Sequence, residues 1–341
     1  MTEIKIHASR DYTVSIGSGI LSRIADWIPS GAGVCIVSDS NVGPIFGNIL
    51  QEIFHANKIQ NCYYTIPAGE ASKNAESYLA LLDYLSVNQF TRSDCIIALG
   101  GGVVGDLAGF AAATYLRGIP YIQVPTTLLA MVDSSVGGKT GIDLPAGKNL
   151  VGAFYQPAAV ICDTDLMNTL PEEIFRDGCA EVIKYAVLYD PALFAHLEER
   201  GMDFDRERVI TQCIEWKRKA VEQDELDRGS RMLLNLGHTI GHAIESVSNY
   251  CISHGQAVAI GIATVSRAAG CTDTDRILSL LHRFGLPTSC QYSAEALAQA
   301  AKSDKNRSGD QVHLIIPRAI GDCAVMPIDI EELEVFIKKG L

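Results

Sequence analysis

Three histidines and one carboxylate in the second half of the chain have the residue types and spacing of a metal site. His238 and His242 stand four residues apart in HTIGH, so a helix would place both on one face. His254 begins the next apolar segment, HGQAVAIG, while Glu181 and Lys184 stand three apart in EVIK. Imidazoles with one carboxylate and an open position are typical of a catalytic Zn²⁺ site. The spacing leaves open which two histidines bind the metal.

A glycine-rich turn follows the apolar run DCIIAL. Gly100, Gly102 and Gly105 form a GxGxxG pattern that opens onto a helical segment. Such glycines let backbone N–H groups approach a pyrophosphate at a helix N-terminus. The acidic residue expected about 20 positions later is missing, because that stretch reads PYIQVPTT. The turn is therefore either a phosphate-binding turn outside the standard dinucleotide fingerprint, or a βα turn that only packs tightly.

Charged residues also follow two other strand-like runs. Asp39 ends VCIVSD and could accept hydrogen bonds from ribose hydroxyls, and PAGEASK places Glu70 and Lys73 after a further run.

The stretch 132–157 is long and rich in glycine, and it is predicted to be a flexible loop. It holds Asp133, Lys139, Lys148 and Asn149, which suit the binding of phosphate or hydroxyl groups. The alternative is a solvated loop with incidental lysines.

Lys217, Arg231 and Asn235 complete a polar set in the second half of the chain. Either cation alone could be a solvated charge on a helix.

Two kinds of segment must position these residues. Short apolar runs rich in Val, Ile and Cys alternate with helical patterns in the first half, as in a parallel sheet with helices on both faces. The expected strands are 34–39, 61–67, 94–100, 121–126 and 158–163, after an antiparallel edge pair at 3–8 and 12–17; the expected helices are 41–58, 72–89 and 107–118.

The pattern changes near Leu170, where Pro171 precedes a long helical segment. The fold class is therefore an α/β Rossmann-like domain followed by a mostly helical domain, with the boundary at 169/170. The expected later elements are helices at 172–190, 206–226, 231–248, 256–270, 275–285 and 331–341, and strands at 312–317 and 323–328.

Composition limits the possible partners. The 341 residues include 28 Lys+Arg and 40 Asp+Glu, a net charge of −12 that argues against generic binding to nucleic acid or an anionic membrane. A local cluster of cations could still bind an anionic substrate. The ten cysteines are scattered without a CxxC, and no apolar run reaches the length of a membrane span. The sequence therefore predicts a soluble cytoplasmic protein with reduced cysteines.

The motifs together resemble those of the 3-dehydroquinate synthase family of sugar-phosphate cyclases, from the first strand to the last helix. They are PAGEASK, ALGGGVVGDLAGFAAATYLRGI, QVPTTLLAMVDSSVGGKTGI, GKNLVGAFYQP, CAEVIKYA, LLNLGHTIGHAIE, SHGQAVAIG and SDK. The resemblance implies an NAD-binding domain at 1–169, a helical zinc- and substrate-binding domain at 170–341, and a homodimer.

The resemblance also implies roles for individual residues. By position, Glu181, His238 and His254 match the metal ligands, which makes His242 a substrate-side residue. The implied cofactors are NAD and Zn²⁺, with Co²⁺ as another possible metal. The catalytic matches are Asp133, Lys139, Lys184, Lys217, Arg231, Asn235 and His242. The substrate-binding matches are Asn149, Lys305 and Arg117, the last reaching into the site of the other subunit. The cofactor contacts are matched by Asp39, Asn41, Glu70, Lys73, Gly101, Gly102, Asp106, Thr126, Thr127, Lys139, Lys148 and Thr169.

The implied reaction converts 3-deoxy-D-arabino-heptulosonate 7-phosphate to 3-dehydroquinate and phosphate in the shikimate pathway. It proceeds by transient NAD-dependent oxidation, phosphate elimination, reduction and an intramolecular aldol. Gln256 and Asn306 depart from the usual pattern, but neither is an expected ligand. The alternatives are another sugar-phosphate cyclase, or a metal-dependent NAD polyol dehydrogenase. Lys217 and Arg231 favour a substrate with a carboxylate, and the wider cation set argues against the dehydrogenase.

Overall fold

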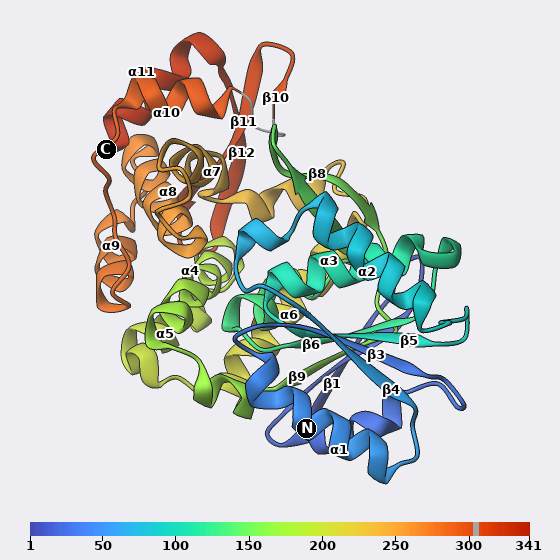
Figure 1. Cartoon of the computed structure of the whole chain (residues 1–341). Helices are drawn as coiled ribbons and strands as arrows, with labels where there is room; N and C mark the ends of the chain where they lie inside the picture. Colours follow the sequence, from blue (N-terminus) through green and yellow to red (C-terminus); the bar gives the residue numbers. More distant parts are fainter. Residues whose placement is uncertain (303–306) are drawn as a thin grey trace. The chain divides into compact units, whose positions relative to one another are not determined.

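A computed structural model describes residues 1–302 and 307–341 and divides the chain into two units (Figure 1). Unit 1 comprises Met1–Leu170 with Lys217–Leu226, and unit 2 comprises Pro171–Trp216 with Asp227–Leu341. The segment from Lys217 to Leu226 groups with the first unit, although it follows Pro171 in the sequence.

Within the described residues, unit 1 is built on a seven-stranded sheet in the order β1-β2-β9-β6-β5-β3-β4. The β1–β2 pair is antiparallel and the other pairings are parallel, as the sequence predicts. The strands are β1 (Thr2–Ile6), β2 (Tyr12–Gly17), β3 (Val34–Asp39), β4 (Asn61–Ile66), β5 (Cys95–Gly100), β6 (Tyr121–Pro125) and β9 (Ala159–Asp163), and the helices are α1 (Asn48–Ala56), α2 (Ala75–Val87) and α3 (Gly102–Thr114).

The strand order reverses between β3 and β5. The connection from β3 to β4 and the connection from β5 to β6 run in opposite directions across the sheet. Right-handed crossovers therefore place α1 and α3 on opposite faces (Figure 1). Such a reversal opens a crevice at the carboxyl ends of the two strands, which is where open α/β sheets bind nucleotides.

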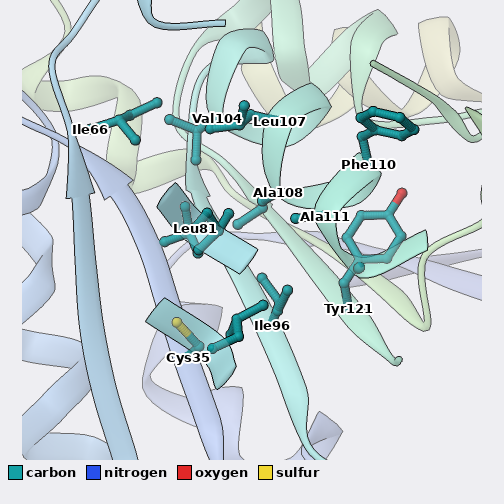
Figure 2. Packing of buried hydrophobic residues seen from close by; sticks show 14 of the residues in the cluster. Cys35, Ile66, Leu81, Ile96, Val104, Leu107, Ala108, Phe110, Ala111 and Tyr121 are labelled. Carbon is teal, nitrogen blue, oxygen red and sulfur yellow. The ribbon is translucent and has the colours of Figure 1, made fainter. Parts of the chain in front are cut away.

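One hydrophobic cluster of unit 1 lies between the sheet and the helices α2 and α3 (Figure 2). Cys35 and Ile96 from the strands pack with Leu81 of α2, and with Val104 and Ala108 of α3. All five are at most 1% exposed. Burial of each large aliphatic side chain stabilises the fold by about 1.5–3 kcal/mol, which fixes the ends of β3 and β5 relative to α3.

Unit 2 is mostly helical, and its described residues add a three-stranded sheet in the order β10-β11-β12. The elements are α4 (Glu172–Tyr189), α5 (Pro191–Arg200), α6 (Arg206–Gln223, whose last turns belong to unit 1), α7 (His238–Val247), α8 (His254–Ala269), α9 (Thr274–Arg283), α10 (Ala294–Ala301), α11 (Ile330–Gly340), β10 (Arg307–Ser308), β11 (Gln311–Ala319) and β12 (Asp322–Asp329). No helix among the described residues is long and apolar enough to cross a membrane.

The expected helix at 231–248 is wrong as a single element. A 3₁₀ helix, η8 (Ser230–Asn235), ends before α7 begins at His238, because Gly237 has a φ of +77°. A Cβ on Gly237 would also lie 2.7 Å from the Val258 carbonyl oxygen. Glycine therefore permits both the left-handed turn and the close approach of α8.

The expected loop at 132–157 is also wrong, because most of it forms a hairpin of β7 (Lys139–Leu144) and β8 (Gly147–Phe154). A Cβ on Gly152 would lie 2.1 Å from the Thr140 carbonyl oxygen. Here glycine allows two backbones to approach closely, whereas the composition suggested flexibility.

Candidate active site

Glu181, His238 and His254 converge in unit 2. Glu181 lies in the middle of α4, His238 is the first residue of α7, and His254 is the first residue of α8. Each residue offers one ligand atom, and these atoms all lie within 4.8 Å of one another. His238 Nε2 and His254 Nε2 each lie 3.4 Å from Glu181 Oε1. The resemblance implies the same three residues, and His242 is not part of this group among the described residues.

The chemistry of this donor set fits a divalent cation. Both carboxylate oxygens of Glu181 are buried; Lys184 forms an ion pair with Oε2, whereas Oε1 faces the two imidazole nitrogens without a hydrogen bond of regular geometry in the described part of the chain. A buried carboxylate oxygen that faces two imidazole nitrogens suits a cation shared by all three. Two imidazole nitrogens and one carboxylate oxygen are the ligands of catalytic zinc sites that leave a position open.

The pKa values in this group diverge. Burial, opposed by Glu181, lowers the pKa of His238 to about 4, so its ring is neutral at pH 7. Burial also disfavours the charged forms of Glu181 and His254, but neighbouring charges and hydrogen bonds outweigh this effect. Lys184 and His238 hold the pKa of Glu181 well below its usual range, and hydrogen bonds to Glu181 and Glu245 raise the pKa of His254 to about 10. The carboxylate is therefore ionised at neutral pH.

Groups behind the two histidines orient their rings. His254 Nδ1 lies 3.4 Å from Glu245 Oε2, and His238 Nδ1 lies 3.1 Å from the Leu236 carbonyl oxygen. Contacts of this kind fix which ring nitrogen faces a metal. Glu245 is buried on α7 and was missed by the sequence analysis. Its position seven residues after His238, on the same helix face, is the only signal that could have found it.

Asp177 of α4 holds the start of α8. Its Oδ1 accepts hydrogen bonds from the Ser253 hydroxyl and from the Gln256 backbone N–H, the latter at 3.1 Å. Ser253 precedes α8 and supplies no side-chain cap of its own. Asp177 therefore caps the helix that carries His254, and it too was missed by the sequence analysis.

Lys184 and His242 lie beside the metal group. Lys184 forms an ion pair with Glu181, is 1% exposed, and its Nζ lies 4.9 Å from the Tyr185 ring centroid. The His242 ring lies 5.5 Å from that of His238 and 6.4 Å from that of His254, between centroids. Arg231 and Asn235 are in η8, where Arg231 is 1% exposed.

Asp133 and Lys217 form a pair in unit 1. Lys217 Nζ donates a hydrogen bond of 2.7 Å to Asp133 Oδ1, and the side chains are 8% and 20% exposed. The two residues are 84 positions apart, so spacing alone could not have paired them. Their contact places a cation and an acceptor side by side, which suits a substrate with both a carboxylate and hydroxyls.

Five of the residues expected to contact the cofactor lie at the carboxyl ends of β3, β5 and β6, and the sheet order reverses between β3 and β5. Asp39 ends β3, Gly101 and Gly102 join β5 to α3, and Thr126 and Thr127 follow β6. Asp39 Oδ1 accepts hydrogen bonds from the backbone of Asn41 at 2.8 Å and of Val42 at 2.9 Å.

Thr126 indicates whether a cofactor fits at the carboxyl ends of these strands. Its Oγ1 is buried and has no hydrogen-bond partner among the described residues. An unsatisfied hydroxyl after β6 fits a dinucleotide with phosphate and hydroxyl groups, because the α3 N-terminus follows the adjacent strand β5 and Asp39 ends β3 on the other side of β5.

A second cluster surrounds Lys73, whose side chain is 5% exposed. Its Nζ lies 2.7 Å from Glu70 Oε1, 3.2 Å from Asp106 Oδ2 and 3.7 Å from Asp143 Oδ1. Lys148 Nζ lies 3.9 Å from Glu70 Oε1. Although burial opposes the charge, Asp106 and Glu70 raise the pKa of Lys73. Four predicted cofactor residues are thus brought together with Asp143, which the sequence analysis missed.

The β7–β8 hairpin separates residues that the sequence analysis grouped. Lys139 begins β7 opposite Phe154, whereas the Asn149 backbone N–H donates to Asp143 Oδ1 near the turn. At about 3.3 Å per residue, Lys139 and Asp143 are roughly 13 Å apart along the strand. Lys139 and Asn149 are therefore not neighbours within the hairpin.

The remaining predicted residues are exposed or lie outside the described part of the chain. Arg117 is exposed in η4 (Tyr115–Arg117), and Thr169 is exposed at the end of η6 (Thr164–Thr169). Asn41 is also exposed. Lys305 lies outside the described residues.

Comparison with known proteins identifies the family. The family model described as "3-dehydroquinate synthase N-terminal" matches residues 63–177, and "3-dehydroquinate synthase C-terminal" matches residues 178–307. A 3-dehydroquinate synthase from Pelobacter propionicus is 47% identical over 316 residues, 88% of each chain. One from Enterococcus faecalis is 40% identical over 346 residues, 97% of each chain.

A solved structure has the same fold over its full length. The complex of 2-deoxy-scyllo-inosose synthase with carbaglucose-6-phosphate, NAD⁺ and Co²⁺ superposes with a TM-score of 0.90 at 25% identity, covering 100% of both chains. The matches to both family models and to these relatives cover the parallel sheet, the metal group and the residues around Lys73. The chain therefore belongs to the 3-dehydroquinate synthase family.

Proposed function

We propose that this chain converts 3-deoxy-D-arabino-heptulosonate 7-phosphate to 3-dehydroquinate and phosphate, with NAD and a divalent metal, Zn²⁺ or Co²⁺. The observation that carries the proposal is the convergence of Glu181, His238 and His254 beside Lys184, in a chain of this family. The related cyclase structure with NAD⁺ and Co²⁺ supports the same pair of cofactors. The substrate is an anionic sugar phosphate, which suits the local cations of an otherwise acidic chain.

When bound, NAD⁺ supplies a hydride acceptor and the metal supplies a Lewis acid for substrate hydroxyl oxygens. Glu181, His238 and His254 hold the metal, with Glu245 and Leu236 fixing the rings. The α3 N-terminus binds the pyrophosphate, and Asp39 accepts hydrogen bonds from a ribose. Further cofactor contacts come from Asn41, Glu70, Lys73, Gly101, Gly102, Asp106, Thr126, Thr127, Lys139, Lys148 and Thr169.

The protein's own side chains orient the substrate and balance its charge. Lys217, held by Asp133, binds the carboxylate together with Arg231. Asp133 and Lys184 bind ring hydroxyls, and Asn235 is a further substrate contact. The phosphate group is held by Lys139, Asn149, His242, Lys305 and, from a second subunit, Arg117. The leaving phosphate takes the neighbouring C–H proton with its own oxygen, so positioning is the main contribution of the chain.

Three wider features belong to this proposal. Residues 1–169 bind the cofactor, residues 170–341 bind the metal and much of the substrate, and Lys217 is contributed from within the second range. The enzyme acts as a homodimer, because Arg117 is exposed and matches an arginine that serves the other subunit. It works in the cytoplasm, which agrees with ten free thiols in the described residues.

The test incubates the metal-loaded enzyme with the heptulosonate phosphate and a trace of NAD⁺. We expect phosphate and 3-dehydroquinate to form in equal amounts, with many turnovers per NAD⁺ and no accumulation of NADH. Glucose 6-phosphate serves as the control substrate and should release no phosphate. Accumulating NADH would favour a polyol dehydrogenase, and release of phosphate from glucose 6-phosphate would favour another cyclase.

A further inference from the structure

Two thiols from neighbouring strands lie opposite each other near the amino ends of β3 and β4. Cys35 and Cys62 are register partners in this parallel pair. Partners in register on parallel strands point to the same face of the sheet. Strands are about 4.7–4.9 Å apart, and disulfides span Cα–Cα distances of about 4.4–6.8 Å. The backbone spacing therefore permits a bond between the two sulfurs.

The two thiols differ in access. Cys35 is 0% exposed and lies in the hydrophobic cluster with Leu81 and Ile96 (Figure 2). Cys62 is partly exposed and packs against the same cluster. It also lines a cavity of about 670 Å³, together with His55 and Phe90 among others. A reagent can thus reach Cys62 from this cavity, whereas Cys35 is shielded.

The surroundings also activate Cys62. A hydrogen bond from the Cys35 thiol, aided by the Tyr84 hydroxyl and opposed by burial, lowers the pKa of Cys62 to about 7. The same contact and burial raise the pKa of Cys35. Since the thiolate is the nucleophile, Cys62 is the thiol that attacks and Cys35 the one that remains protonated.

We propose that Cys62 and Cys35 form a modification site for hydroperoxides, in which Cys62 is oxidised first and Cys35 then closes an intrachain disulfide between β4 and β3. With hydrogen peroxide, the Cys62 thiolate attacks one oxygen, the O–O bond breaks, and with one proton the products are a sulfenic acid and water; an organic hydroperoxide releases the alcohol instead. The Cys35 thiol then gives its proton to the sulfenic oxygen as its sulfur attacks the Cys62 sulfur, and the S–O bond breaks to release a second water. Two thiols are oxidised by two electrons, and one peroxide is reduced.

This site is remote from the proposed cofactor contacts. Cys35 is four residues from Asp39 along β3, or roughly 13 Å at about 3.3 Å per residue. The thiols lie toward the amino ends of the strands, whereas the cofactor residues follow their carboxyl ends. Variants at Cys35 and Cys62 therefore test the thiols without removing a group of the active site.

The test treats the full chain at pH 7 with one equivalent of hydrogen peroxide, blocks free thiols with iodoacetamide, and maps tryptic peptides by mass spectrometry. Cleavage after Arg23, Lys58 and Lys73 separates Cys35, in 24–58, from Cys62, in 59–73. We expect these two peptides to be joined with the loss of two hydrogens, and separated again by a reductant. Below about pH 7, the rate of Cys62 alkylation should fall about tenfold per pH unit.

Three variants distinguish this chemistry from general oxidation. In Cys62→Ser, Cys35 has no partner thiol with which to form the disulfide. When the treated protein is unfolded, iodoacetamide should therefore alkylate Cys35 to the same extent with and without prior peroxide. Cys35→Ala should leave Cys62 as a sulfenic acid that a dimedone probe captures. Cys251→Ser removes an exposed thiol and should not change the yield of the joined peptide. Two results would overturn the proposal. One is that peroxide oxidises Cys251 faster than Cys62, and the other is that Cys62 in the wild type is oxidised without forming the disulfide with Cys35.

Discussion

His254 Nδ1 lies 3.4 Å from Glu245 Oε2, so a buried carboxylate stands behind the ring of a candidate metal ligand. The other nitrogen of that ring, Nε2, lies 3.4 Å from Glu181 Oε1. The imidazole therefore connects two carboxylates, one in the metal group and one behind it. This arrangement orients the ring and increases its basicity as a ligand.

Glu245→Gln should weaken metal binding without removing a ligand. The amide keeps the shape of the side chain but loses the charge that holds the His254 ring, so we expect a loss of metal affinity of about 10- to 100-fold. Competition with a chelating dye on the purified protein measures this directly. Glu332→Gln, an exposed change on α11, is the matched control and should leave the affinity unchanged. Equal affinities in both variants would assign Glu245 a packing role only.

Asp177→Ala should destabilise the start of α8 in the metal-free protein. It removes the acceptor for the Ser253 hydroxyl and the Gln256 N–H, and loss of a helix cap costs about 0.5–2 kcal/mol. Urea unfolding of the metal-free enzyme measures this cost, and Asp177→Asn, which keeps an acceptor oxygen, should recover much of it. Because His254 begins the same helix, metal affinity should fall in parallel. An unchanged unfolding midpoint in the Ala variant would contradict the capping role.

The parts of the fold that could be predicted are those with a local signal. Strands β3, β5 and β9 are buried on both faces, so they appear as continuous runs of Val, Ile and Cys. The break at Gly237 is not visible in this way, because the apolar pattern continues across it and only the approach of α8 requires the turn. The hairpin containing Gly152 was missed for a similar reason: its glycines pack two backbones together.

The same distinction applies to the site. The four-residue spacing of His238 and His242 suggests a metal on one helix face, but the choice of ligand depends on how α4, α7 and α8 pack. Glu245 and Asp143 were missed because their contacts join segments whose packing no short motif encodes. The contact of Asp143 with Lys73 spans 70 positions, and Asp143 is on a hairpin that was expected to be a loop.

Lys217→Met should reduce turnover of the carboxylate substrate. It removes the cation that donates to Asp133 Oδ1 and, in the proposed function, binds the substrate carboxylate. We expect kcat/KM to fall by about 10²- to 10³-fold, the usual cost of losing a positioned donor. Steady-state phosphate release measures this, with metal content as a check. Lys219→Met, at an exposed position two residues on along α6, should retain wild-type kinetics. A similar fall in kcat/KM in both variants would show that Lys217 has no specific role in binding the substrate carboxylate.

Asp106→Asn should change how stability depends on pH. Burial, opposed by Lys73, raises the pKa of Asp106 to about 6, whereas an unfolded aspartate titrates near 3.9. Between about pH 4 and 6 the folded protein therefore binds more protons at this residue than the unfolded chain. This group thus lowers the free energy of unfolding as the pH rises through that window.

The difference in unfolding free energy between wild type and Asp106→Asn should accordingly fall from pH 4 to pH 6 and be constant above pH 7. Urea titrations across this range, without NAD, measure it. Asp83→Asn, an exposed change on α2, is the matched control. A difference that rises with pH would mean that the ion pair with Lys73 outweighs burial.

Mixing two inactive variants tests whether Arg117 serves the other subunit. In the homodimer of the proposed function, both sites of an Arg117→Ala dimer lack the arginine, and both sites of a Lys139→Ala dimer lack the lysine. A mixed dimer has one site with its own Lys139 and the other subunit's Arg117, so that site is complete. Random reassociation of equal amounts produces half mixed dimers with one complete site each, so we expect about a quarter of wild-type phosphate release. Mixing Lys139→Ala with His242→Ala should restore none, because each site then lacks a residue of its own subunit. Absence of rescue in the first mixture, with subunit exchange verified, would place Arg117 outside the second subunit's site.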